Sequence, residues 1–336
     1  MELGVTSEHA GKRPASIRKP ARLAHLRVDP RGYPIIATVD QAPGHVDFGS
    51  LSEKRKLALA TFDLCAVCGL PFAAELRWQV SFEESSAKSK SFISNEAPVH
   101  EVCGLYAAQV CPFVSSPYAR LGDQIRKGMK RPGVVFLTGF QQTKRVFGGR
   151  SGLQNSEFVL HFENSEAERS HRLSSAADAA EAYQQALDNE LEIKIDDVEQ
   201  ELTNLLTSLT ATEGEDSGSV MAGAAWFIGG AFCPGVGKVQ GMERFARDSM
   251  YTTIARRVLE PEFAKEFEET NDIYARVAVR WLNSRRHLPK ILANWRSVAS
   301  SRMRHGRPSL KDAREPVAHK KAKRKLQNAA RRRNRR

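Results

Sequence analysis

The sequence is poor in cysteine: its 336 residues hold five, at unequal spacing. Such a small, uneven set excludes a disulfide scaffold, and in a reducing compartment paired cysteines more often hold a metal ion. The first 23 residues carry several charges and no apolar run, which is not the pattern of a secretory signal. We therefore expect a cytoplasmic protein that begins with a flexible basic arm over residues 1–24.

Long apolar runs are also scarce. The one stretch that resembles a membrane span covers residues 217–237, which are free of charge but include six glycines and Pro234. Glycine and proline disfavour a continuous helix, so a buried glycine-rich helix or turn is the better interpretation. We expect no membrane span.

Catalytic motifs are missing too. The Gly-Lys pair at 237–238 lacks the glycine that a phosphate-binding loop needs five positions before Gly237, where Phe232 stands. No Ser/His/Asp trio or carboxylate pair is recognisable, and His45, His161 and His171 are isolated in the sequence. We assign no catalytic residue and favour a non-enzymatic protein, although an unrecognised enzyme in the C-terminal half stays open.

The net charge of +12 is concentrated at one end. Residues 301–336 hold 15 Lys and Arg against Asp312 and Glu315, whereas residues 155–216 hold 16 acids against three bases. A segment with so few apolar residues cannot bury a core, so we expect the tail 301–336 to be disordered when free.

This tail is the predicted site of contact with DNA or RNA, because its charges would release counterions from a polyphosphate. The alternatives are a solubilising tail, a tail that docks on the acidic 155–216 segment, or contact with an anionic membrane surface. The predicted nucleic-acid-binding residues are Lys320, Lys321, Lys323, Arg324, Lys325, Arg331, Arg332, Arg333, Arg335 and Arg336.

A cysteine–histidine constellation is the most specific signal. Cys65 and Cys68 form a CxxC followed by Gly69, which permits the tight turn of a zinc knuckle. His100 and Cys103 are three residues apart in a segment that reads as a short helix over 100–110, so they share one face of its first turn. The spacing predicts a zinc site on these four residues; a cluster of buried thiols is the alternative.

Between the two pairs of ligands, the alternation of Leu76, Trp78, Val80 and Phe82 predicts a strand, and Phe92 and Ile93 mark a return strand. Knuckle, hairpin and two ligands at a helix start is the order of a treble-clef zinc finger. Four protein ligands leave no open position, so the zinc is expected to be structural. Treble-clef nucleases place a catalytic histidine on the hairpin, and residues 69–99 contain none.

Cys111 is a fifth candidate ligand. On a continuous helix it would lie about 12 Å along the axis from Cys103, too far for both to bind one ion. We interpret Cys111 as a buried thiol at the helix end, and Cys233 as a core residue.

Several segments resemble an uncharacterised treble-clef-like zinc-finger family found in actinobacteria and their phages. They are RGYPI (31–35), DFGS (47–50), LCAVCG (64–69), EAPVHEVCGLYAAQVCPF (96–113), SPYAR (116–120) and RPGVVFL (131–137). The resemblance covers about residues 25–165 and implies the same four zinc ligands, with Cys111 as a motif position of unknown role. Here a Ser/Lys-rich stretch replaces a longer family segment, and Ala97 stands where proline is usual. The family implies no reaction.

The rest of the chain reads as helical. Strands are expected at 134–138 and 157–162, which completes an α+β zinc domain over residues 25–165. A long amphipathic helix is expected over 175–210, capped by Ser175, and a helical domain over 217–300 with Trp281 and Trp295 in its core. Leu191, Ile195, Val198, Leu202, Leu205 and Leu209 form a heptad stripe within that long helix.

Two functional hypotheses follow. The first is a non-enzymatic, zinc-stabilised protein that contacts nucleic acid through its basic tail. The second is a protein–protein adaptor or scaffold, in which the 191–209 stripe forms a homo-oligomer and the tail binds an acidic partner. Packing of that stripe within one chain is the common alternative to self-association.

Overall fold

The computed structural model describes residues 16–42, 45–82, 92–111, 114, 134–150, 158–207 and 273–294. All of them belong to one compact unit, Met1–Arg296. The tail 301–336, the charge-free stretch 217–237 and Trp295 lie outside the described residues, so the predictions for them stay predictions. Within the described part of the chain, no helix is both long and apolar enough to cross a membrane.

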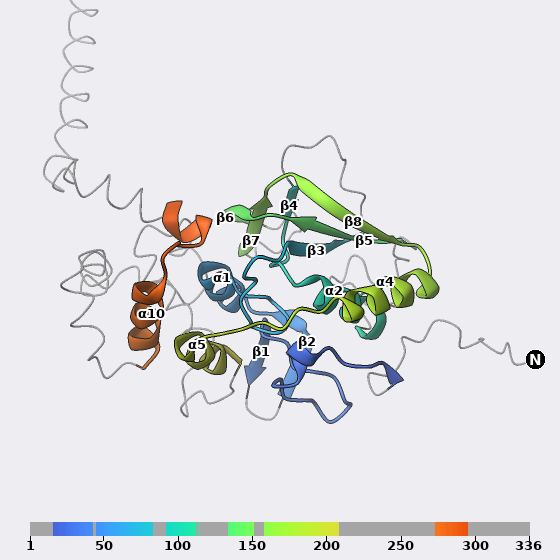
Figure 1. Cartoon of the computed structure of the whole chain (residues 1–336), viewed down its shortest axis with the longest axis horizontal. Helices are drawn as coiled ribbons and strands as arrows, with labels where there is room; N and C mark the ends of the chain where they lie inside the picture. The colour runs from blue at the N-terminus through green and yellow to red at the C-terminus, as the bar shows by residue number, and fades with distance from the viewer. Residues whose placement is uncertain are drawn as a thin grey trace, which may run out of the picture. The chain divides into compact units, whose positions relative to one another are not determined.

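The fold contains two three-stranded antiparallel sheets, joined by a long, bent, two-stranded ribbon that consists of β5 and β6 on one side and β7 and β8 on the other. β5 pairs with β8 and β6 pairs with β7, so the β5–β6 arm of the ribbon runs along the β7–β8 arm (Figure 1). β3 adds to the first half beside β5, and β4 adds to the second half beside β7. The strands are β3 (Arg77–Ser81), β4 (Phe92–Ser94), β5 (Val135–Phe140), β6 (Thr143–Arg150), β7 (Phe158–Asn164) and β8 (Ala167–Leu173).

A buried polar network holds the bend of the ribbon. The Asn164 side chain accepts a hydrogen bond from the Thr143 hydroxyl at 2.9 Å and donates one to the Gln79 side chain at 2.8 Å. Gln79 in turn donates to the carbonyl of Glu96 at 2.6 Å. Buried amides are costly unless paired, so this set of bonds specifies where the two sheets meet.

Helices cover the sheets. α2 and α4 pack against each other and against the β3–β5–β8 sheet, whereas α1 contacts β7 and α5 packs on α10 (Figure 1). β1 (Val39–Ala42) and β2 (His45–Leu51) form a separate two-stranded sheet. The helices are α1 (Glu53–Phe62), α2 (Glu101–Val110), α4 (Ala176–Asp188), α5 (Asp197–Thr207) and α10 (Ile273–Ser284).

The prediction of one long helix over 175–210 is wrong. Ser175 does cap a helix, with a reciprocal bond to Asp178, but α4 ends at Asp188 and α5 begins only at Asp197. Leu191 and Ile195 therefore precede α5, and the heptad stripe does not lie on one helix. Leu202 is buried within the single chain, which agrees with packing inside one chain, the alternative to self-association.

The predicted hairpin between the two ligand pairs is also wrong. β3 and β4 form where strands were expected, but β3 pairs with β5 and β4 pairs with β7. The sequence alternation located the strands correctly. It carried no information on which strands pair.

Two expected boundaries change as well. The basic arm is not flexible to residue 24, because a 3-10 helix, η2 (Ala21–Leu23), is ordered there and Leu23 is fully buried. The expected boundary at 165 falls inside the ribbon, two residues before β8 begins. Trp281 of α10, expected to anchor a separate helical domain, packs edge-on against Phe62 of α1 with ring centroids 5.0 Å apart.

Candidate metal centre

A tight turn places the first two cysteines. The Cys65 N–H donates to the carbonyl of Leu70 and the Gly69 N–H donates to the carbonyl of Cys65, both at 2.9 Å. Gly69 has a φ of 73°, which glycine adopts without strain. The Val67 N–H points at the Cys65 sulfur from 3.4 Å. The sequence CAVCG thus folds into the expected knuckle, with both sulfurs on its inner side.

The start of α2 supplies the other two side chains. His100 is the residue before the helix, in extended conformation, and Cys103 lies in the first turn. Two backbone bonds of 2.8 Å between Val99 and Trp78 tie this helix start to β3. The His100 N–H lies 3.3 Å from the Cys65 sulfur, which links the helix start to the knuckle.

The four side chains form one closed cluster. Their ligand atoms all lie within 4.8 Å of one another, and Cys65, Cys68, His100 and Cys103 are all fully buried. A tetrahedral zinc site with Zn–S bonds of about 2.3 Å has sulfur–sulfur edges of about 3.8 Å. The cluster is therefore of the right size to hold a metal ion in a tetrahedral Cys3His arrangement.

The orientation of His100 fits a ligand role. Its Nε2 lies 3.2 Å from the carbonyl of Pro71, which can only accept, so Nε2 carries the proton. Nδ1 is then the unprotonated nitrogen, and it lies 3.3 Å from the Cys68 sulfur, inside the cluster. A second hydrogen bond that fixes the ring and its tautomer is typical of metal-binding histidines.

The pKa values of the three buried thiols are shifted in different directions. Burial is the strongest influence on each of them; it raises the pKa of Cys68 and of Cys103 well above the ordinary thiol value. At Cys65 hydrogen bonds from the Cys103 and Cys68 thiols, together with His100, outweigh burial and lower the pKa well below that value. A metal ion binds cysteine as the thiolate, so a divalent cation in the cluster would favour the deprotonated form of all three.

Helix α5 covers the knuckle. The Thr203 hydroxyl donates to the carbonyl of Gly69 at 3.2 Å, and a Cβ atom added at Gly69 would lie 2.7 Å from a methyl group of Thr207. Gly69 is thus required twice, by its φ and by the close approach of α5. Helix α5 therefore seals the cluster on this side.

The fifth cysteine of the motif is not part of the cluster. Cys111 is the C-cap of α2, at the opposite end of the helix from Cys103, and it lies outside the cluster as the helix geometry predicted. The expectation that its thiol is buried is wrong, because Cys111 is half-buried. Cys233 lies outside the described residues. So do all ten predicted nucleic-acid-binding residues, from Lys320 to Arg336.

Sequence reasoning missed a second group of polar residues. His171 appeared isolated, yet its Nε2 lies 2.6 Å from a carboxylate oxygen of Glu101, and its ring stacks on Trp78 with centroids 5.1 Å apart. Glu101 directly follows His100 of the cluster, whereas His171 lies on β8. Only the pairing of β8 with β5 brings them together, and no spacing rule would have found it.

No family model, curated protein or solved structure matches this chain. The resemblance to the actinobacterial and phage family therefore stays an expectation. The geometry of the cluster is what indicates a metal site.

Proposed function

We propose that Cys65, Cys68, His100 and Cys103 hold a structural zinc ion between a knuckle and a helix start, and that the protein is a non-enzymatic one that contacts DNA or RNA through its tail 301–336. The observation that carries the zinc half is the closed, fully buried Cys3His cluster. The nucleic-acid half is supported by the concentration of positive charge in the tail.

Zinc is favoured over other metals by the ligand set. Thiolates are soft ligands that suit zinc, copper(I) and iron–sulfur clusters, whereas magnesium and calcium prefer oxygen. A tetrahedral site with three sulfurs and one imidazole nitrogen is typical of structural zinc. Four protein ligands leave no coordination position for water or a substrate, so the ion would supply stability alone.

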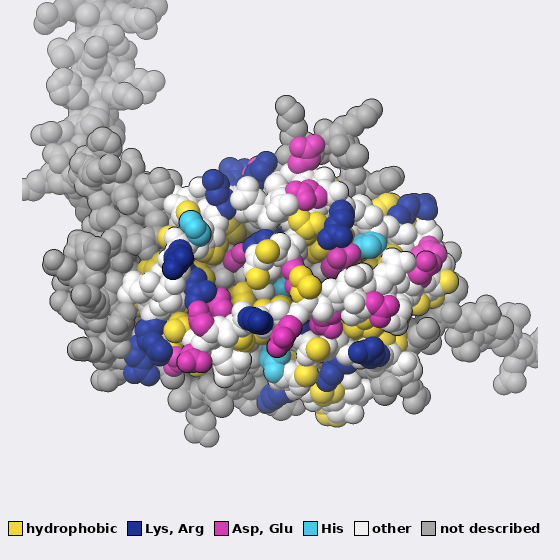
Figure 2. Space-filling model, in the orientation of Figure 1, with side chains coloured by type: hydrophobic (Ala, Val, Ile, Leu, Met, Phe, Trp, Pro, Cys, Tyr) yellow, Lys and Arg dark blue, Asp and Glu magenta, His cyan; other side chains and the backbone are white. Residues whose placement is uncertain are grey.

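The tail is favoured over the folded part as the nucleic-acid contact. The whole chain has a net charge of +12 and the tail has +13, so residues 1–300 sum to −1. On the face shown in Figure 2, acidic and basic side chains are interspersed over the described residues. A tail that neutralises about ten phosphates would give a slope of about −9 for log K against log salt on duplex DNA.

One preparation of the full chain tests both halves. Metal analysis should find one zinc per chain, and anisotropy titrations with labelled duplex DNA and single-stranded RNA should show strongly salt-dependent binding. A chain ending at Ser300 should keep its zinc and lose most of its affinity. Equal affinity with and without the tail would defeat the nucleic-acid half while leaving the zinc half intact.

A composition control separates charge from length. In a matched variant, the ten tail residues Lys320 to Arg336 listed above are replaced by glutamine, and binding should fall as far as in the truncated chain. Polyglutamate serves as a competitor with the chemistry of an acidic protein partner. Tighter binding to polyglutamate than to nucleic acid would favour the adaptor hypothesis instead.

A further inference from the structure

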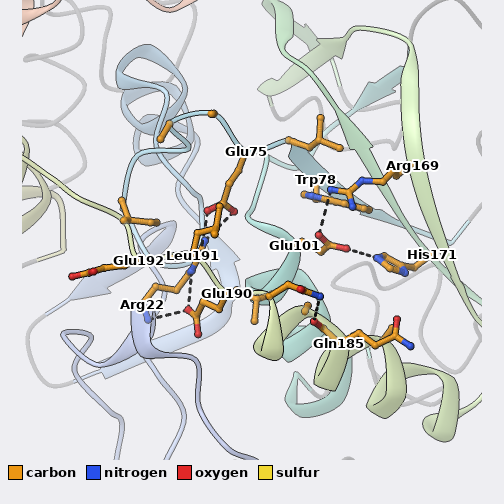
Figure 3. Close-up of a pocket in the computed structure, with 18 of the residues that line it drawn as sticks. Arg22, Glu75, Trp78, Glu101, Arg169, His171, Gln185, Glu190, Leu191 and Glu192 are labelled. Carbon is orange, nitrogen blue, oxygen red and sulfur yellow. Dashed lines mark hydrogen bonds and ion pairs between the residues drawn. The ribbon is translucent and has the colours of Figure 1, made fainter.

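A pocket of about 720 Å³ lies between β8, α4, the start of α2 and the segment that follows α4 (Figure 3). Pockets of this volume are typical of small-molecule sites. It is separate from the metal cluster, although Glu101 and Val102 on its floor directly follow the ligand His100.

The floor of the pocket is a rigid platform. Register places Trp78 of β3, Gly139 of β5 and Arg169 of β8 in one row across the sheet. Gly139 has no side chain, so the indole of Trp78 lies across β5; a Cβ atom added at Gly139 would come within 2.9 Å of it. The indole thereby reaches β8, where it stacks on His171 and lies 5.4 Å below the guanidinium of Arg169.

Two polar groups on this platform have unused hydrogen-bonding capacity. Arg169 donates no hydrogen bond to a described residue; its nearest charge is Glu101 at 3.7 Å, and its side chain is 63% exposed. His171 donates from Nε2 to Glu101, because a carboxylate only accepts, and its Nδ1 has no partner in the described part of the chain. Figure 3 shows Glu101 between the two side chains.

Two of the carboxylates that line the pocket, Glu75 and Glu190, already have a cationic partner. Arg22 binds both oxygens of Glu75 at 3.2 Å and one oxygen of Glu190 at 2.9 Å, and it also donates to the carbonyl of Leu191 (Figure 3). The backbone N–H groups of Ala21 and Arg22 bind the same Glu190 carboxylate. Two carboxylates of this wall thus share one arginine, and Glu192 and Lys194 of the segment after α4 also line the pocket. On the side of the sheet, the basic groups of the pocket are Arg169 and His171.

The remaining lining combines the polar side chains Gln185, Asn189, Glu192 and Lys194 with a set of aliphatic ones. Leu76 and Val102 are buried beneath the floor, Ala182 and Ala186 come from α4, and Ile193 from the segment after it. Leu191, on the rim, is 68% exposed, which makes it the most exposed large apolar side chain among the described residues. An apolar ligand body would cover it.

We propose that this pocket binds a small amphiphilic anion. Its phosphate or carboxylate head would accept from Arg169 and from the Nδ1–H of a doubly protonated His171, and its apolar body would lie against the aliphatic side chains and Leu191. The Arg169 guanidinium lies over the indole, and the planar fork of its N–H groups is the geometry that oxyanions accept. The site does not depend on the tail or on nucleic acid.

Calorimetry on the full-length, zinc-loaded chain with three probes that share an eight-carbon body tests the proposal. Octyl phosphate and octanoate should bind, and octanol should bind at least tenfold more weakly, since it lacks the charged head. The tighter of the two anions identifies the head group. Octanol binding as tightly as the anions, or the absence of binding by all three, would overturn the proposal.

Variants divide the site into head and body. Arg169→Gln should weaken both anions at least tenfold and leave octanol unchanged, whereas Leu191→Ser should weaken all three probes. Arg145→Gln is the matched control, because Arg145 is an exposed strand arginine paired with Glu163 away from the pocket. Equal effects of Arg169→Gln and Arg145→Gln would refute the assignment of the head.

A second readout needs no altered pocket. Octanoate added to the wild-type chain should shift the imidazole proton resonances of His171, assigned with a His171→Gln variant, and should leave those of His25, whose ring nitrogen lies 2.9 Å from the carbonyl of Cys68, unmoved. A shift at His25 without one at His171 would place the ligand elsewhere and overturn the proposal, even if Arg169→Gln failed to fold.

Discussion

The metal cluster and the amphiphile pocket adjoin at the start of α2 but are built in opposite ways. The cluster takes four side chains from two short segments, and all four are fully buried. The pocket takes its side chains from η2, the segment before β3, β3, α2, β8, α4 and the chain after α4, and several are exposed. The contrast teaches that a site made from local segments leaves a pattern in the sequence, whereas one made by strand register leaves none.

Metal removal is expected to have the largest effect. Structural zinc contributes an apparent binding free energy of about 10–16 kcal/mol, which equals or exceeds the net stability of a typical domain of about 5–15 kcal/mol. Cys65→Ser should therefore lose both the zinc and the fold, measured by metal analysis and far-ultraviolet circular dichroism, and a strong chelator should unfold the wild type. Cys111→Ser is the control and should keep both. A fold indifferent to chelator would refute the metal centre.

Breaking the pocket wall should cost less. Arg22→Met removes a side chain that is 4% exposed and leaves the carboxylates of Glu75 and Glu190 without their cation. Loss of one partner from a buried ion pair typically costs about 3–5 kcal/mol. Urea unfolding should show this loss with zinc still bound. Arg145→Met, at a side chain that is 61% exposed, should cost under about 1 kcal/mol. Equal losses in the two variants would mean that the buried ion pairs of Arg22 stabilise the fold no more than an exposed pair does.

The platform beneath Arg169 can be disturbed by one methyl group. Gly139→Ala forces a contact of about 2.9 Å with Trp78, and overpacking of this kind typically costs about 1–3 kcal/mol. Trp78→Phe in the same chain shortens the ring and should recover part of the loss, so the two changes should be non-additive in urea unfolding. Strict additivity would show that the two residues are not in contact.

The smallest effect is expected where α4 begins. Ser175→Ala removes the hydroxyl that accepts from the Asp178 N–H at 3.1 Å, and loss of such a cap costs about 0.5–1 kcal/mol. Ser174→Ala is the matched control, because its hydroxyl meets only the side chain of Arg172 at the surface. Thermal melts should separate the two variants by a few degrees at most. A larger loss for Ser174→Ala would contradict the assigned cap.

A capping signal within the 175–210 segment was overlooked. The Asp196 carboxylate accepts from the Glu199 N–H at 2.8 Å, and the Glu199 side chain accepts from the Asp196 N–H at 3.2 Å. This reciprocal pair is a helix start, and it was legible as Asp-x-x-Glu. The heptad stripe led to the opposite conclusion because its 4, 3, 4, 3 spacing continues across residues 189–196, which are not helical.

β8 shows where sequence patterns stop being informative. Its residues, AERSHRL, have no apolar alternation, and all but His171 and Leu173 are exposed. The strand exists because its backbone completes the edge of β5, a long-range pairing that side-chain periodicity does not encode. The same pairing creates the Arg169–His171 platform, so the pocket was invisible for the same reason.

The sequence alone determined the two residue pairs of the metal cluster, β3, α2 and the cap of α4, because each depends on residues within a turn or two of one another. The two pairs, 32 residues apart between Cys68 and His100, meet only in the fold. The tertiary structure decided which strands pair, where the 175–210 segment breaks, and which polar side chains meet around the pocket. Those outcomes depend on the free energy of contacts between distant segments, which cannot be predicted from the residues of one segment alone.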